Sequence, residues 1–347
     1  IYSVPPSAPF LDGLADGLIA ACGGRARPEA LADALVFLPN RRAARGFASA
    51  LHAAFGGPLL APDIRTLGEI EGEDAPVLGP DALNLPPAIE GARRRGVLAR
   101  LIEAWRTQIG EPPLPPASAL AAADELAAVM DQTAVRPEAD GPGAGAFDWK
   151  ALDALAAEAD LAEHWRLSAS FLQIVADNWP SYLAARGEIE PAARQLAAAR
   201  ALATRWAEAP PARPVVIAGS TGAHPASRIL MRAALRLPRG AVVLPGLDPD
   251  LENWAAVRLA PSHPQHALLK TLEALGLWPD EVRLAPFARP ETRSADARRR
   301  LVNEALAPAE ATTSWRSRLK HLARPEPADM LVRRGLENLT LIEAEDE

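Results

Sequence analysis

The sequence predicts an α/β protein, with a parallel-sheet domain and a mostly helical domain inserted into it. Short apolar runs alternate with helical patterns in residues 1–80 and again in residues 209–300. Alternation of this kind is typical of parallel strands joined by crossover helices. Residues 81–208 lie between the two segments, and their pattern is helical almost throughout. We therefore expect one sheet domain built from the two outer segments.

The first outer segment contains three expected strands and two expected helices. The strands are expected at residues 2–4, 34–38 and 64–67, where short apolar runs occur. One helix is expected from about Ala8 to Ala21. A second is expected from Asn40, a good N-cap residue, to about Phe55.

The second outer segment returns to strand patterns. Pro214–Ala218 and Ala241–Leu244 are continuous apolar runs, which suit strands covered on both faces, and a helix is expected between them at Pro225–Leu237. Residues 301–347 are expected to form a helical linker, rich in arginine, that ends in the apolar run Leu339–Ile342. Because nothing follows with which that run could pair, we expect the chain to be the N-terminal part of a longer protein.

Composition and charge narrow the function classes. Hydrophobic residues make up 49% of the 347 residues, so the chain has enough apolar residues for a sizeable core. The net charge of −7 argues weakly against a dedicated nucleic-acid binder, although arginines cluster, for example at residues 93–95 and 298–300, where we assign them no role. The sequence contains no signal-peptide pattern and no membrane-spanning stretch. Its single cysteine, Cys22, excludes an internal disulfide and a thiolate metal site, so we expect a cytoplasmic protein without a bound metal.

The segment after the first strand is a degenerate nucleotide-binding loop. A phosphate-binding loop needs glycines, backbone N–H donors and a lysine. This segment instead contains Pro5, Pro6 and Ser7, and proline has no N–H to donate. None of the three lysines in the chain follows a glycine. We therefore expect no ATP hydrolysis and no catalytic residue in this chain.

A glycine-containing turn follows the strand at residues 214–218. Gly219, Ser220, Thr221 and Gly222 are similar to part of a dinucleotide-binding turn, but the third glycine of that motif is absent. One interpretation is a nucleotide- or NAD-binding site. The other is a tight strand-to-helix turn, in which glycine supplies an unusual φ and which lies near bound DNA.

The charge pattern that most suggests binding follows the second strand. Arg41, Arg42 and Arg45 come directly after the expected cap Asn40. Arginine in the first turn of a helix opposes the helix dipole, at a cost of about 0.3–1 kcal/mol each. The pattern indicates either a DNA-phosphate contact at the end of the strand or a solvated helix face.

Several segments, taken in order, carry a resemblance to a known family. They are Val4–Leu11, Phe37–Arg45, Leu85–Ile89, Ala162–Trp165, Phe171–Val175, Pro214–Gly222, Leu237–Asp248 and His263–Gln265. Together they resemble the AddB family of alphaproteobacteria, described as inactivated superfamily I helicases. The resemblance implies a RecA-like fold in which Arg41 and Arg42 belong to the motif that contacts single-stranded DNA. It also implies that the family's nuclease, and the cysteines of its iron–sulfur cluster, lie in a C-terminal part that this chain lacks.

The resemblance leads to a functional expectation. We expect the non-catalytic, helicase-like portion of a subunit for double-strand-break repair by homologous recombination. Its partners would be DNA, as a single strand or a duplex end, and a helicase–nuclease subunit of the AddA type, with no membrane involved and no cofactor in this segment. The alternatives are a nucleotide- or NAD-binding enzyme that uses Gly219–Gly222, and an assembly scaffold that does not contact DNA.

Overall fold

The chain forms two compact units. The computed structural model describes residues 1–68, 85–134, 172, 175, 178–248, 250–251, 253–288, 291–308, 320, 328–340 and 342. The first unit comprises Ile1–Gly68, Trp206–Ala223 and Leu230–Glu347. The second comprises Glu69–Arg205 and His224–Ile229.

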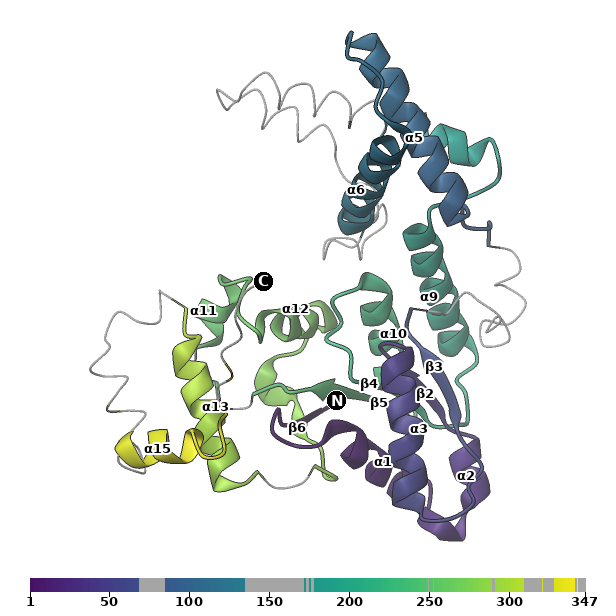
Figure 1. Cartoon of the computed structure of the whole chain (residues 1–347). Helices are drawn as coiled ribbons and strands as arrows, with labels where there is room; N and C mark the ends of the chain where they lie inside the picture. Colours follow the sequence, from purple (N-terminus) through teal and green to yellow (C-terminus); the bar gives the residue numbers. More distant parts are fainter. Residues whose placement is uncertain are drawn as a thin grey trace. The chain divides into compact units, whose positions relative to one another are not determined.

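The first unit contains a six-stranded sheet in which every strand pairing is parallel (Figure 1). The strands lie in the order β3-β2-β4-β5-β1-β6. They are β1 (Tyr2–Val4), β2 (Leu35–Leu38), β3 (Asp63–Thr66), β4 (Val215–Ala218), β5 (Gly240–Pro245) and β6 (Arg283–Leu284). The predicted parallel sheet built from both outer segments is therefore confirmed. The sequence did not predict β6, a two-residue edge strand whose side chains are both exposed.

Helices occur between the strands of the outer segments, as expected, and in the C-terminal segment from residue 301. They are α1 (Phe10–Ala21), α2 (Pro28–Ala32), α3 (Arg41–Phe55), α10 (Pro225–Leu235), α11 (Trp254–Arg258), α12 (His266–Leu275), α13 (Arg293–Ala305) and α15 (Ala328–Gly335). Two short 3-10 turns, η1 (Gly24–Ala26) and η4 (Pro279–Glu281), complete the described elements of these segments.

Helices α1 and α3 cover one face of the sheet. Val36 of β2 packs there with Leu14 of α1 and Phe47 of α3, all of them buried. Successive residues of a strand point to opposite faces, so the next residue, Phe37, faces the other side. Its ring lies edge-on to Trp206, with ring centroids 6.2 Å apart. Burial on both faces explains why the central strands are continuous apolar runs.

The described part of the middle segment is helical. It contains α5 (Gly91–Gln108), α6 (Pro116–Ala134) and α9 (Pro191–Glu208). Leu98 and Ala123 are fully buried in a core that α5 and α6 share. The resembling segments Ala162–Trp165 and Phe171–Val175 lie wholly or largely outside the described residues.

A charge network that is largely buried lies in this helical unit. Arg94, the middle residue of the first arginine run, is 7% exposed and lies 2.8 Å from both Asp131 and Glu190. The Trp179 indole N–H donates to the Glu190 carboxylate. Burial raises the pKa of Glu190, while the positive charge of Arg94 opposes that rise.

Candidate functional site

The carboxyl ends of parallel strands meet at one edge of a sheet, here called the carboxyl edge. The three predicted site segments all lie on it, because each directly follows a strand. Along the edge they occur in the order Asn40–Arg45 after β2, Gly219–Gly222 after β4, and Pro5–Ser7 after β1. The loop after β5, residues 246–248, lies between the last two. In open α/β sheets ligands bind at this edge, so the fold brings together the segments singled out in the sequence.

One position where such a sheet can bind a ligand lies between β1 and β5. The connection from β1 to β2 crosses the sheet in one direction, and the connection from β5 to β6 crosses it in the other. Crossovers between parallel strands are almost always right-handed, so these two connections run over opposite faces. Adjacent strands whose connections leave on opposite faces define a switch point, and ligands bind in the crevice there.

Prolines line this switch point, where the loops after β1 and β5 contact each other. The Gly246 N–H donates to the Val4 carbonyl at 2.8 Å. A Cβ on Gly246 would lie 3.5 Å from the Pro6 ring, so the loop after β1 rests against the loop after β5. Pro5 is buried, and its carbonyl accepts from the Ala8 N–H at 3.0 Å. Two successive residues without N–H groups leave few donors for a phosphate.

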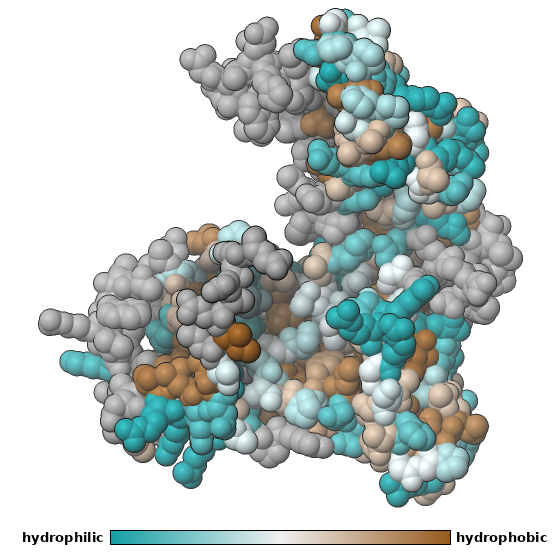
Figure 2. Space-filling view, viewed as in Figure 1, coloured by the Kyte–Doolittle hydropathy of each residue, from teal (hydrophilic) through white to brown (hydrophobic). Residues whose placement is uncertain are grey.

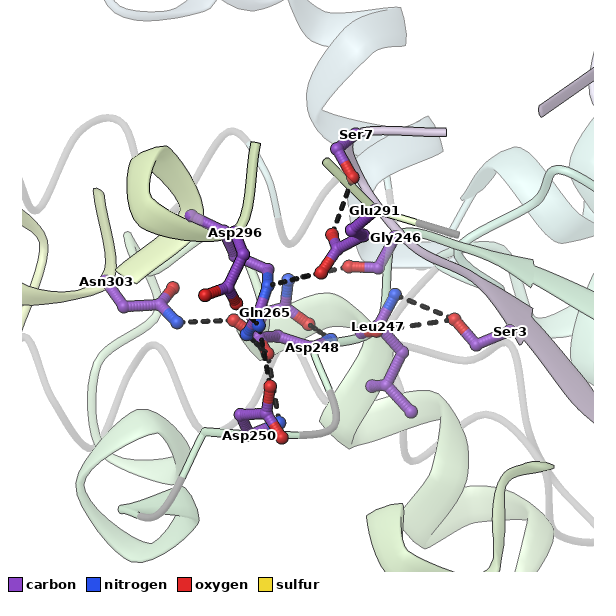
Figure 3. Close-up of polar contacts among 11 residues, drawn as sticks. Ser3, Ser7, Gly246, Leu247, Asp248, Asp250, Gln265, Glu291, Asp296 and Asn303 are labelled. Atoms are coloured by element: carbon purple, nitrogen blue, oxygen red, sulfur yellow. Dashed lines mark hydrogen bonds and ion pairs between the residues drawn. The ribbon is translucent and has the colours of Figure 1, made fainter. Parts of the chain in front are cut away.

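Beside the prolines, Arg299 of α13 lies among four carboxylates, a group we call the Arg299 cluster. Figure 3 labels these carboxylates, which belong to Asp248, Asp250, Glu291 and Asp296. The guanidinium lies 2.5 Å from Asp248, 2.6 Å from Asp250 and from Asp296, and 3.3 Å from Glu291. The Arg299 side chain is only 7% exposed and that of Asp248 only 1%. Burial alone would lower the pKa of Arg299, but the carboxylates of Asp248 and Glu291 raise it above its ordinary value.

Hydrogen bonds join this cluster to both loops of the switch point. Ser7 donates to Glu291 at 2.5 Å, and Asn303 donates to Asp248. The Gln265 amide donates to the Gly246 carbonyl at 2.8 Å and accepts from the Asp248 N–H at 3.3 Å. With four carboxylates around one guanidinium, the crevice carries excess negative charge, which opposes the binding of nucleotide phosphates.

The Gly219–Gly222 turn is packed against α12. Gly219 and Gly222 have φ values of 74° and 69°, in the left-handed region that favours glycine. The Thr271 hydroxyl donates to the Thr221 carbonyl at 2.6 Å, and a Cβ on Gly222 would lie 2.4 Å from the Thr271 methyl. Ser220 is buried, and its hydroxyl accepts from the Gly222 N–H. These contacts fit the structural interpretation of the turn, because Thr271 lies where a ligand would have to approach Gly222.

The arginines after β2 are on the surface. The Asn40 side chain accepts from the Ala43 N–H at 2.9 Å and caps α3, as the sequence predicted. Arg41, Arg42 and Arg45 are all exposed, and the first turn of α3 has no acidic residue. In Figure 2 the surface over this end of α3 is hydrophilic. Cationic side chains and the positive end of the helix dipole together favour an anion at this position.

Sequence reasoning missed Arg299 and Arg94 as structurally important residues. Each is the middle member of a run of three arginines, and each is buried among carboxylates. The only local signal for Arg299 is Asp296, three residues earlier on the same helix. Its most buried partner, Asp248, is 51 residues away in sequence, beyond the reach of pattern analysis.

Comparisons with known proteins add no family assignment. No protein-family model matches the sequence, and no curated protein is significantly similar to it.

Among the described residues, no group of histidine, cysteine, aspartate and glutamate side chains has an arrangement suited to a metal ion. Within that same part of the chain, every helix is too short or too polar to cross a bilayer.

Proposed function

We propose that this chain is a non-catalytic, DNA-binding portion of a RecA-like, helicase-type subunit that takes part in processing DNA double-strand ends. The partner would be a helicase–nuclease, as the resemblance to the AddB family implies. The observation that carries the proposal is the contrast along the carboxyl edge. The crevice where a nucleotide would bind is lined by prolines and carboxylates, whereas the end of α3 presents Arg41, Arg42 and Arg45 to solvent.

Two further features are consistent with the proposal. The strand order places β1 inside the sheet, with a switch point beside it, as in nucleotide-binding α/β folds, so the architecture is compatible with a RecA-like origin. The exposed arginines lie two strands away from that crevice, after β2, so the strand order separates them from the carboxylates of the Arg299 cluster. Contacts of this kind would bind the phosphate backbone with little sequence preference.

A salt series on matched variants tests the proposal. Each single-strand phosphate that a protein neutralises steepens the log–log salt dependence of the binding constant by about 0.7. The double change Arg41→Ala/Arg42→Ala should therefore weaken binding to a single-stranded oligonucleotide and flatten that slope by roughly one unit. Fluorescence anisotropy measures both quantities, in this chain alone and in complex with a helicase–nuclease of the AddA type.

The matched control removes two other exposed arginines from the same unit. Arg25 and Arg27 lie on the connection between α1 and β2, which approaches the opposite edge of the sheet. The change Arg25→Ala/Arg27→Ala alters the net charge equally and should leave the slope unchanged. Equal effects of the two double variants would indicate general charge attraction. An unchanged slope for Arg41→Ala/Arg42→Ala in the complex would refute the proposed DNA contact.

A further inference from the structure

A depression on the first unit combines tryptophans with carboxylates. It has a volume of about 730 Å³, and its lining includes Trp254, Trp278, Asp250, Asp280 and Glu281. None of these residues belongs to the segments singled out in the sequence. We call this feature the tryptophan–carboxylate depression.

Local hydrogen bonds hold the walls of the depression in place. Trp278 precedes η4, and its backbone N–H donates to the Glu281 carboxylate at 2.6 Å. The backbone N–H of Glu281 in turn donates to the Trp278 carbonyl at 3.1 Å. Elsewhere in the lining, Trp254 begins α11, which the Asn253 side chain caps by accepting from the Ala256 N–H at 3.2 Å. The lining is therefore pre-organised, which lowers the entropic cost of binding.

The depression exposes both an indole ring and carboxylate groups to solvent. The Trp278 side chain belongs to a residue that is 58% exposed, although tryptophan is usually highly buried. Among the described residues, Asp280 has no ion pair, and the Asp250 side chain is 67% exposed while it contacts Arg299 on one side. The depression thus presents an open indole surface beside carboxylate oxygens.

This combination selects a cation with a flat, weakly hydrated surface. Indole rings attract cations over their faces, and a guanidinium can stack on an indole while it hydrogen-bonds to a carboxylate. An ammonium group forms the ion pair but stacks less well. Nucleic acid is disfavoured because the carboxylates repel its phosphates. From this complementarity we propose that the tryptophan–carboxylate depression binds an arginine side chain of a basic protein segment on a partner.

The proposal is independent of DNA binding by Arg41 and Arg42, because it rests on different residues and on the opposite charge. It would provide a protein-docking position separate from the end of α3. Trp278 would be the anchor, since exposed tryptophans in pre-formed hollows are typical of residues that dominate an interface. Asp280 would set the preference for arginine through a charge-assisted hydrogen bond.

The test uses a blocked Gly-Arg-Gly-Arg-Gly peptide, titrated into the intact chain at low salt. Binding is followed by NMR through the indole N–H signals of the eight tryptophans, with the Trp278 signal assigned from the Trp278→Phe variant. We expect the Trp278 signal to shift and saturate. Trp278→Ala and Asp280→Asn should each weaken binding about tenfold. Asp16→Asn, which removes an exposed carboxylate from α1, should leave binding unchanged.

Two comparisons make the outcome decisive. A peptide with citrulline in place of arginine keeps the shape but loses the charge, and it should not shift the Trp278 signal. Because Asp280 is exposed, Asp280→Asn should fold even if Trp278→Ala does not. The inference is overturned if the wild type shows no saturable shift up to millimolar peptide. It is also overturned if the citrulline peptide binds as well, or if Asp16→Asn is as impaired as Asp280→Asn.

Discussion

Replacing Arg299 by methionine should strongly destabilise the sheet unit, because it leaves a buried carboxylate without its cation. Asp248 is 1% exposed, and in the variant it would keep the Asn303 amide but lose the guanidinium. Breaking a buried ion pair by removing one partner costs about 3–5 kcal/mol. The Asp250 and Asp296 side chains are 67% and 43% exposed, so their lost ion pairs add at most about 1 kcal/mol each. We expect a total loss of about 3–7 kcal/mol.

Hydrogen exchange across a urea series measures this loss in the unit concerned. Because the chain has two compact units, a single unfolding signal would mix two transitions. Mass spectrometry of peptides that cover β5 and α13 reports the sheet unit alone. At an m-value of about 1–3 kcal/mol per molar urea, the midpoint should fall by at least about 1 M. Arg293→Ala, an exposed arginine on the same helix, should change stability by less than about 0.5 kcal/mol.

The double variant separates the charge effect from packing. Arg299→Met combined with Asp248→Asn contains no buried unpaired charge at this pair, so it should recover at least half of the lost stability. A loss below about 1 kcal/mol in Arg299→Met would refute the reasoning. That result would mean that solvent reaches Asp248 and that the Arg299 cluster behaves like a surface ion pair.

Three further predictions concern other parts of the chain. Gly222→Ala should lower the free energy of unfolding in urea by about 2–5 kcal/mol, and Gly276→Ala by only about 1–2 kcal/mol. Both glycines have positive φ, but only Gly222 faces Thr271. Equal costs for the two variants would contradict the packing argument. The raised pKa of Glu190 means that its protonated form is favoured on folding. Its stabilising contribution is therefore complete below its ordinary value of 4.5 and lost as pH rises through the raised pKa. In calorimetry from pH 4.5 to 7, wild type should lose stability relative to Glu190→Gln, and a constant difference would contradict this. ATP with magnesium and NAD should not raise the melting temperature, whereas a real site at a hundred times its dissociation constant would add about 2.7 kcal/mol.

The central strands β2 and β4 were predictable because their residues are buried on both faces. Val36 and Phe37 of β2 point to opposite sides of the sheet, and both are fully buried, so an uninterrupted apolar run was enough to locate the strand. Strand β6 could not be located in this way, because its residues are not buried. Arg283 and Leu284 are exposed, and their strand conformation comes from pairing with β1, which no local pattern records.

The candidate site was predictable only in part, for a related reason. The proline loop, the glycine turn and the capped arginines are local features, and the parallel sheet places them on one edge. The contents of the crevice depend on contacts between distant residues. Arg299 meets Asp248 across 51 positions, and Arg94 meets Asp131 across 37. A run of three arginines does not reveal which member is buried, because the acids that select it lie elsewhere in the chain.

The position of β1 inside the sheet has a consequence for biosynthesis. Tyr2 of β1 pairs with Val243 of β5 and with Arg283 of β6, so both neighbours are made long after β1 itself. At synthesis rates of about 5–20 residues per second, β1 would wait on the order of 10 to 50 s for β5 to be made. Strands β2 and β3, with α3 between them, can pair much earlier. The nascent chain therefore carries an unpaired apolar strand until β5 has been made, a state in which chaperone binding would be most useful.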